Sequence, residues 1–248
     1  MIEALHLRKA FGSRLRQVVA VDGVGFRAAD GEITGLLGPN GAGKTTTLRM
    51  LYTLMQPDSG GVLVDGLDPA KDAAGVRRRL GVLPDARGLY KRLTARENIA
   101  YFGRLHGLTE AAIEARTSEL IATLDMADFA DRRAEGYSQG QRTRTAIARA
   151  LVHDPRNVLL DEPTNGLDVM STRSMRTFLR KLRDEGRCVL FSSHIMQEVA
   201  ALCDRIVVIA RGRVVADGTP GMLREQAGTA NLEDAFVKVI GSGEGLFT

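Results

Sequence analysis

The feature that most constrains this chain is a glycine-rich segment of nine residues. It fits the phosphate-loop pattern G-x-x-x-x-G-K-[ST], follows the apolar run Ile33–Leu37 and precedes a helix-like run from Thr45 to Met55. Glycines allow the backbone to approach phosphate oxygens, and the amides at the start of the helix complete an anion site. We therefore predict a nucleotide-phosphate site formed by Gly38, Pro39, Asn40, Gly41, Ala42, Gly43, Lys44, Thr45 and Thr46.

Three further side chains extend this prediction to phosphoryl transfer. Lys44 is expected to contact the β- and γ-phosphates, and Thr45 to offer its hydroxyl to Mg²⁺. The apolar run Val158–Leu160 ends in Asp161 and Glu162. ATP hydrolysis needs a carboxylate that holds Mg²⁺ and a group that orients the attacking water. We assign the first role to Asp161, directly or through water, and the second to Glu162.

A histidine follows another predicted strand. His194 comes after Cys188–Phe191 and two serines, beyond the carboxyl end of that strand, where a sheet of this kind binds its ligand. We predict that His194 hydrogen-bonds the γ-phosphate. The remaining histidines, His6, His106 and His153, have no such placement and are expected to be structural or solvated.

Strand and helix patterns alternate around these motifs, which is typical of an α/β fold with a parallel sheet. Residues 1–37 are β-rich, about 88–153 are helical, and residues 1–217 are expected to form one domain. The tail, 218–248, is expected to hold a helix at Leu232–Ile240 and a glycine-rich end. The other predicted strands are Ile2–Leu7, Val18–Phe26, Val62–Val64, Leu80–Leu83 and Ile206–Ile209. The other predicted helices are one that begins after Thr109 as its N-cap, one from Gln141 to about His153, and those at Val169–Arg183 and Met196–Cys203.

Composition agrees with an ordinary globular protein. The chain has 248 residues, 44% of them hydrophobic and 26% charged, and its net charge is +4. This mild basic excess fits an anionic membrane or nucleic acid, but it more often serves solubility alone. We expect Cys188 and Cys203 to be reduced core thiols. We also expect no signal peptide and no membrane span, because no apolar run approaches the roughly 18 residues required.

The segment Tyr137-Ser138-Gln139-Gly140-Gln141 opens an arginine-rich helix, whose polar face is expected to carry Arg142, Arg144 and Arg149. Ser138 and Gly140 could present a hydroxyl and a backbone N–H to a phosphate. The same residues equally make a good N-cap, so the pattern alone leaves both interpretations open.

Taken together, the ordered motifs resemble the ATP-binding cassette (ABC) ATPases over nearly the whole chain. The resemblance implies a phosphate-loop parallel-sheet core, an N-terminal antiparallel β subdomain and an inserted helical subdomain. It also implies Mg²⁺-dependent ATP hydrolysis. The motifs that carry it are GPNGAGKTT at 38–46, YSQGQ at 137–141, VLLDEP at 158–163, NGLD at 165–168 and SSH at 192–194.

The resemblance implies roles across a head-to-tail dimer. Two cassettes would enclose two ATP molecules, with Ser138, Gly140 and Gln141 contacting the γ-phosphate that the other cassette binds. Asp168 would lie in the loop that links the two sites. Phe11 resembles the aromatic residue that stacks on adenine, although its spacing alone fits a core position equally well.

Two positions depart from the family pattern. Tyr137 and Gln139 replace the usual Leu and middle Gly of the signature, while its phosphate-contacting residues remain. Asp85 stands after Leu83-Pro84, where the family usually has a glutamine that touches Mg²⁺ and couples the site to the membrane subunit. Aspartate still offers oxygen to a hard cation, so we predict that Asp85 is a modified metal and coupling contact.

The amino-acid sequences of the segments at 85–108 and 193–199 are similar to those of the ATPase subunits of sodium-extruding ABC exporters, the NatA group. Membership would imply a cytoplasmic chain, peripheral on the inner face of the cell membrane. A separate permease subunit would dock on Arg87 to Arg104, and the second cassette would be another copy of this chain. Related cassettes serve antibiotic, multidrug or polysaccharide exporters.

Two other classes of function are disfavoured. Soluble cassettes that act on ribosomes or DNA usually carry two cassettes, a long coiled coil or zinc-binding cysteines, none of which this sequence contains. No nucleic-acid partner is therefore expected. A regulatory module without turnover is disfavoured because Lys44, Asp161, Glu162 and His194 are all present.

Overall fold

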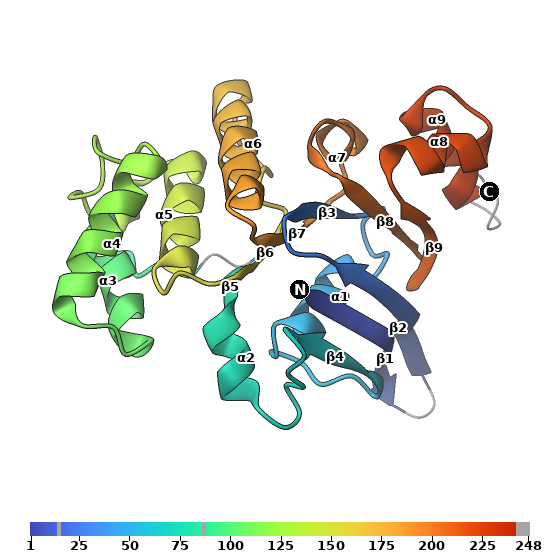
Figure 1. Cartoon of the computed structure of the whole chain (residues 1–248), viewed down its shortest axis with the longest axis horizontal. Coiled ribbons are helices and arrows are strands. Elements are labelled where there is room, and N and C mark those ends of the chain that lie inside the picture. The colour runs from blue at the N-terminus through green and yellow to red at the C-terminus, as the bar shows by residue number, and fades with distance from the viewer. Residues whose placement is uncertain (14–15, 86–87, 242–248) are drawn as a thin grey trace.

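The computed structural model describes residues 1–13, 16–85 and 88–241, which form two sheets with helices around them (Figure 1). The smaller sheet is antiparallel, with strand order β2-β1-β4. This arrangement confirms the predicted antiparallel N-terminal part, although its strands are longer than the pattern indicates. The hairpin continues past the predicted Leu7 and through Asp22-Gly23 because shifts in register absorb the irregular residues. The strands are β1 (Ile2–Ser13), β2 (Arg16–Ala28) and β4 (Ser59–Val64).

The larger sheet has six strands in the order β5-β6-β7-β3-β8-β9. All neighbouring pairs are parallel except β8 and β9. The parallel core confirms the predicted α/β fold. Its strands are β3 (Glu32–Leu37), β5 (Leu80–Leu83), β6 (Asn157–Asp161), β7 (Cys188–Ser193), β8 (Arg205–Ala210) and β9 (Arg213–Gly218).

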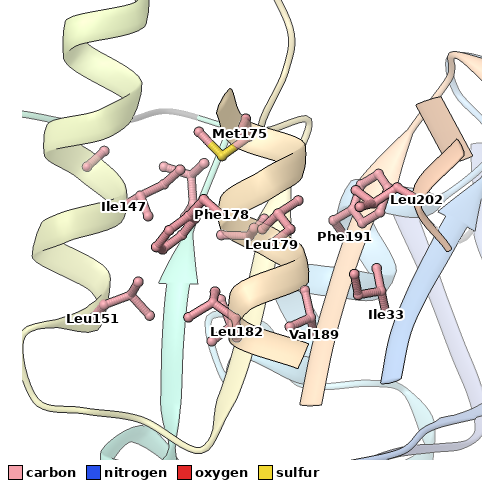
Figure 2. Packing of buried hydrophobic residues seen from close by; sticks show 14 of the residues in the cluster. Ile33, Ile147, Leu151, Met175, Phe178, Leu179, Leu182, Val189, Phe191 and Leu202 are labelled. Carbon is pink, nitrogen blue, oxygen red and sulfur yellow. The ribbon is translucent and has the colours of Figure 1, made fainter. Parts of the chain in front are cut away.

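The central strands of this sheet are buried on both faces, which explains their continuous apolar sequence. Successive residues alternate between two cores. In β6, Val158 and Leu160 belong to the core under the helices, and Leu159 belongs to the core facing the antiparallel sheet. Figure 2 shows the first core, where Phe178 and Leu182 lie between the sheet and Leu151.

Three helices gather at one end of the molecule (Figure 1): α3 (Ala95–Leu105), α4 (Glu110–Thr123) and α5 (Gln139–Leu151). They fall within the helical block predicted at about 88–153, and Thr109 caps α4 as predicted. A 3₁₀ turn, η1 (Ala134–Gly136), precedes α5. One detail of the pattern was wrong: Arg149 is 7% exposed and lies over the Phe102 ring, so it does not belong to the polar face of α5.

The other helices cover the sheets. The helix after the phosphate loop, α1 (Lys44–Leu51), ends earlier than the predicted Met55 because Thr53 adopts a positive φ in the turn that follows. The predicted helices at 169–183 and 196–203 are present as α6 (Val169–Asp184) and α7 (Met196–Leu202). The short α2 (Ala73–Arg79) was not predicted, since its apolar positions are too few to show a helical period.

Beyond β8 the chain continues into β9, α8 (Pro220–Ala227) and α9 (Leu232–Gly241). The predicted tail helix is present as α9, which packs on α7, α8 and β9. The sequence analysis did not foresee β9 or α8. The predicted glycine-rich end falls largely on 242–248, outside the described residues, and the division into a domain at 1–217 and a tail stays a prediction.

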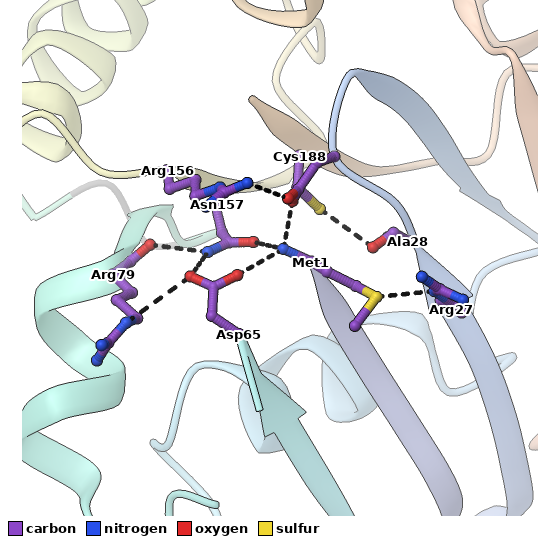
Figure 3. Close-up of polar contacts among 9 residues, drawn as sticks. Met1, Arg27, Ala28, Asp65, Arg79, Arg156, Asn157 and Cys188 are labelled. Carbon is purple, nitrogen blue, oxygen red and sulfur yellow. Dashed lines mark hydrogen bonds and ion pairs between the residues drawn. The ribbon is translucent and has the colours of Figure 1, made fainter. Parts of the chain in front are cut away.

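A polar junction joins the two sheets (Figure 3). The α-ammonium of Met1 donates to Asp65 Oδ1 and to Asn157 Oδ1, both at 2.6 Å. Asn157 begins β6 and is fully buried, and its amide also donates to Asp65 Oδ2 at 2.9 Å. The antiparallel sheet is thereby fixed against the strand that ends in Asp161.

Cys188 and Cys203 are free and buried, as predicted. Burial raises the pKa of the Cys188 thiol to about 12, so it stays protonated. Within residues 1–13, 16–85 and 88–241, no helix has the length and apolar character required to cross a bilayer.

Candidate active site

The predicted motifs meet at one edge of the large sheet. Strands β5, β6, β7 and β3 are neighbours and parallel, so their carboxyl ends lie side by side. They end next to Asp85, Asp161, His194 and the phosphate loop, respectively. A cavity of about 350 Å³ opens there, and it is lined by Ala20, Asn40, Gly41, Ala42, Gly43, Lys44, Thr45, Thr46, Asp85, Glu162, Asn165 and His194.

Two glycines of the phosphate loop are required by its geometry. Gly43 has φ +105°, and a Cβ there would lie 2.5 Å from the carbonyl oxygen of Ala20. At Gly38 a Cβ would overlap the carbonyl oxygen of Ile209. Any larger residue would strain the backbone or push the loop away from its neighbours, so the loop depends on both glycines.

The start of α1 is open toward the cavity. Gly43 is the N-cap of this helix and has no side chain, so it provides no hydrogen bond to the first amides. Unpaired N–H groups and the positive end of the helix dipole favour a bound anion. This open helix start fits the phosphate site that the sequence predicts at residues 38–46, and the site itself stays a prediction.

Lys44 lies at the base of the cavity and is 6% exposed. Its Nζ donates to the carbonyl oxygens of Gly38 at 2.7 Å and Pro39 at 3.1 Å, and it lies 3.9 Å from Glu162 Oε1. Burial lowers the pKa of the Lys44 ammonium, and the charges of Glu162 and Asp161 oppose that effect. The loop carbonyls thus hold a desolvated cation beside the phosphate site.

The donor set beside Lys44 fits Mg²⁺. Asp161 is 2% exposed, and its Oδ1 accepts hydrogen bonds from Ser192 Oγ at 2.5 Å and Thr45 Oγ1 at 3.4 Å. In the described part of the chain, Asp161 Oδ2 is buried without a hydrogen-bond partner. A buried carboxylate oxygen with no donor is costly unless a cation satisfies it.

No cluster of three or more His, Cys, Asp or Glu side chains capable of holding a metal occurs among the described residues. That finding is compatible with Mg²⁺, which usually takes one or two carboxylates together with substrate phosphates and water. Thr45 and Asp161 lie together as predicted. Asp85 also lines the cavity, but its predicted contact with the metal stays a prediction.

Glu162 and His194 form a pair across the cavity mouth. His194 Nδ1 lies 2.9 Å from Glu162 Oε2, and because a carboxylate can only accept, the ring nitrogen donates. Glu162 has φ +49°, which is unusual for a residue other than glycine, and its amide donates to Ser192 Oγ at 3.0 Å. Strained backbone of this kind is frequent at functional sites.

The signature residues are not brought to this cavity within one chain. Ser138 caps α5, where its hydroxyl accepts from the Gln141 amide at 3.3 Å and the Gln141 side chain accepts from the Ser138 amide at 3.1 Å. Both alternatives left open by the sequence therefore remain, since the N-cap exists and any phosphate contact needs a second chain. Gly140 lines a separate, smaller cavity beside α6.

Two other predicted residues lie outside the phosphate cavity. Asp168 caps α6, and its carboxylate accepts from the Ser171 amide and hydroxyl, both at 2.8 Å. These hydrogen bonds lower the pKa of Asp168. Phe11 is 41% exposed on β1 opposite Val18, so the core alternative for Phe11 is wrong, and its stacking on adenine stays a prediction.

Several residues of the site were not singled out from the sequence. Ser192 holds both Asp161 and the Glu162 amide, and Ala20 lines the cavity from β2. The position of Ser192 at the end of a buried strand was a usable signal. Ala20 gave none, because it reaches the cavity only through the packing of the antiparallel sheet on the phosphate loop.

A parallel sheet with a phosphate loop at its edge, a Mg²⁺-compatible carboxylate and a paired glutamate defines a phosphate-loop ATPase. A family model described as ABC transporter matches residues 21–165. The chain is 44% identical to the ABC transporter ATP-binding protein NatA of Bacillus subtilis, with 98% of this chain and 99% of that protein covered. It belongs to the ABC transporter family and is an ABC ATPase.

Two further likenesses are informative. The chain is 35% identical to the linearmycin resistance ATP-binding protein LnrL of Bacillus subtilis, covering 98% of this chain and 79% of that protein. Its structure matches a dimeric ATP-binding cassette in a post-hydrolysis state bound to ADP and Pi, with a TM-score of 0.81 at 25% identity, and 88% of this chain and 98% of that chain are covered. The expected fold is thereby confirmed.

Proposed function

We propose that this chain is the ATP-hydrolysing subunit of an ABC exporter and that separate membrane subunits carry the cargo. The observation that carries the proposal is the position of Glu162, between the buried ammonium of Lys44 and the ring of His194 at the mouth of the phosphate cavity. A carboxylate held there can accept a proton from water that attacks a γ-phosphate.

Each residue has a defined part in this mechanism. The amides of the phosphate loop and Lys44 bind the phosphates and balance their charge. Glu162 orients and polarises water, while His194 holds Glu162 and hydrogen-bonds the γ-phosphate. Mg²⁺, when bound, would neutralise phosphate charge, and Thr45, Asp161 and Asp85 are the residues proposed to hold it.

A second copy of the chain would complete the site. Ser138 is exposed at the start of α5, and Val169 and Met170, which follow Asp168, are 82% and 69% exposed. Apolar side chains that protrude beside polar helix caps are typical of a surface that another protein covers. In the proposed head-to-tail dimer, Ser138, Gly140 and Gln141 of one copy contact the γ-phosphate held by the other.

A groove between the sheet and the helices supports a membrane partner. It encloses about 390 Å³ and is lined mainly by apolar and cationic side chains from the turn after α1 and from α2, β5, α3 and α5, with no acidic residue among the described residues that line it. An amphipathic helix with a carboxylate would fit such a groove. We propose that a cytoplasmic helix of the permease docks there, which places this chain on the inner face of the membrane.

This groove differs in part from the docking surface predicted at Arg87 to Arg104. Arg87 lies outside the described residues, and Arg104 points away into an ion pair with Glu110 at 2.7 Å. Phe102 and Arg149, in contrast, line the groove together. The proposed docking surface therefore uses the inner side of α3.

For the cargo we propose sodium, because the relative named NatA matches over nearly the full length of both chains. The second candidate is an antibiotic, since a relative named for linearmycin resistance also matches along 98% of this chain. Neither cargo need touch the cassette, so the permease decides between them.

Replacing Glu162 with Gln tests the chemistry. The amide keeps the shape of the side chain but cannot take a proton from water, so ATP turnover is expected to fall about 10²- to 10⁴-fold while ATP binding persists. Size-exclusion chromatography in ATP should then show a stable dimer. If Glu162→Gln stays monomeric and hydrolyses ATP at the normal rate, the role of Glu162 is wrong.

Affinity purification from native membranes tests the transport role. Recovery of a multi-span membrane protein is expected, and the complex can then be assayed in vesicles for ATP-driven sodium efflux. Efflux of an antibiotic in place of sodium would favour the second cargo. Recovery of ribosomes or nucleic acid would contradict the exporter proposal.

A further inference from the structure

We propose that Glu198 is a positioning residue that clamps the two loops carrying Glu162 and His194 into one unit. The inference rests on the proposed function of that pair. It assigns a role to a buried carboxylate that does not line the phosphate cavity and so acts through its neighbours.

Glu198 lies on α7 and is 7% exposed. Its Oε2 accepts a hydrogen bond from Thr164 Oγ1 at 2.5 Å and another from Ser193 Oγ at 3.2 Å. Both donors are also buried, with Thr164 7% exposed and Ser193 fully covered. A single carboxylate oxygen therefore joins the segment after β6 to the end of β7.

Each donor is close to a residue of the proposed catalytic pair. Thr164 lies two residues after Glu162 in a turn that the Asn165 amide closes by donating to the Glu162 carbonyl at 3.2 Å. Ser193 precedes His194, and its Oγ accepts from the Ile195 amide at 3.0 Å. Ser193 thus fixes the backbone on both sides of His194, and Glu198 in turn fixes Ser193.

The pair needs this support. Glu162 has a positive φ, a conformation that persists in a non-glycine residue only when surrounding contacts impose it. The His194 side chain is 38% exposed, so packing alone does not fix the position of its ring. If the two loops moved independently, the 2.9 Å contact between His194 and Glu162 would loosen.

The unfavourable free energy of burying the Glu198 carboxylate also supports a positioning role. Among the described residues no Lys, Arg or His lies within ion-pair distance of its carboxylate, and its hydrogen-bond donors include the two hydroxyls. A buried carboxylate without a counter-ion is unfavourable, and an apolar side chain would pack at lower cost. A positioning role explains why an acceptor occupies this place.

Steady-state ATP turnover of the full chain, purified with its membrane partner, tests the clamp. Glu198→Ala removes the shared acceptor and should lower kcat about 10- to 100-fold while KM for ATP changes less than about threefold. Glu198→Gln keeps an oxygen for both hydroxyls and should retain kcat within about threefold. Glu225→Ala, on the exposed side of α8, is the matched control and should leave both constants unchanged.

Thr164→Val provides a second route if Glu198→Ala fails to fold, because it removes one donor while keeping the shape of the side chain. It should also lower kcat, and its effect should largely disappear in a His194→Ala background, since both changes disrupt the same pair. Equal losses in both backgrounds, or a rise in KM that accounts for the whole loss, would overturn the proposal.

The Glu162→Gln variant separates the two levels of inference. If Glu162→Gln is inactive and Glu198→Ala is normal, the clamp is wrong and the proposed function stands. If Glu162→Gln is fully active, the proposed function itself is wrong.

Discussion

The N-termini of α1 and α5 differ in how their backbone amides are capped. The first amides of α1 follow Gly43, which supplies no side-chain cap. The first amides of α5 follow Ser138, whose hydroxyl accepts from the Gln141 amide, while the Gln141 side chain accepts from the Ser138 amide. One helix start is left open to an anion, whereas the other is closed by its own side chains.

This difference indicates which part of the proposed ATP site belongs to a single chain. An open helix start beside a buried cation such as Lys44 concentrates positive charge, which a bound phosphate would offset. A capped helix start is stable in the isolated chain, because its hydrogen bonds come from side chains of the same helix. We infer that α5 presents a rigid surface to another molecule, and that α1 belongs to a pocket within its own chain.

The largest expected effect lies at the open helix. Lys44→Ala removes the buried ammonium that faces the phosphates, so ATP affinity should fall on the order of 100-fold or more. Fluorescence titration with a labelled ATP analogue measures this change. Lys71→Ala, at a lysine that is 86% exposed, is the control. Unchanged affinity in Lys44→Ala would remove Lys44 from the site.

The other end of α5 predicts a pH dependence. His153 stacks on His106 with ring centroids 3.6 Å apart, and burial lowers the pKa of His153 to about 4 from an ordinary value near 6.5. Between those values the unfolded chain binds a proton that the folded chain does not. The free energy of unfolding should therefore be highest above pH 6.5 and fall toward pH 4, by at most roughly 3 kcal/mol.

Urea unfolding between pH 5 and 7.5 measures this loss. His153→Gln removes the titrating ring and should flatten the slope over that range, since glutamine keeps an N–H that can donate to the Leu80 carbonyl. An unchanged slope in this variant would show that other groups cause the pH dependence.

A smaller effect is expected at Asp85, which lines the open site. Asp85→Ala should raise the Mg²⁺ concentration needed for half-maximal ATP turnover about tenfold and weaken stimulation by the membrane partner. Asp85→Gln restores the residue usual in the family and should recover coupling. If Asp85→Ala leaves both quantities unchanged, Asp85 is neither a metal contact nor a coupling residue.

The smallest expected change in stability concerns the capped helix. Ser138→Ala should lower the free energy of unfolding by about 1 kcal/mol, as for other N-caps. Thr109→Ala removes the comparable cap of α4 and should cost a similar amount. ATP turnover distinguishes them, because only Ser138 is proposed to contact the phosphate of a second chain. Equal turnover in the two variants would contradict that contact.

Much of the fold could be predicted because its signals are local. A buried parallel strand needs a continuous apolar run, and β3, β6 and β7 have one. Elements without such a signal were missed: α2 is short, and β9 has alternating partly exposed residues after a turn at Arg211-Gly212. Arg149 was misplaced because its burial depends on Phe102, which lies on another helix.

By itself, the sequence determined the phosphate loop and the order of the motifs. Gly43 and Lys44 act within a few residues of each other, and a local backbone pattern specifies such contacts. Only the tertiary structure decided that Glu162 meets His194, that Asp85 lines the same cavity and that Glu198 joins the two loops. The contacts of Glu162 with His194 and of Thr164 with Glu198 join segments 32 and 34 residues apart. The order of strands in the sheet brings these segments together, and it is set by packing that no local pattern encodes.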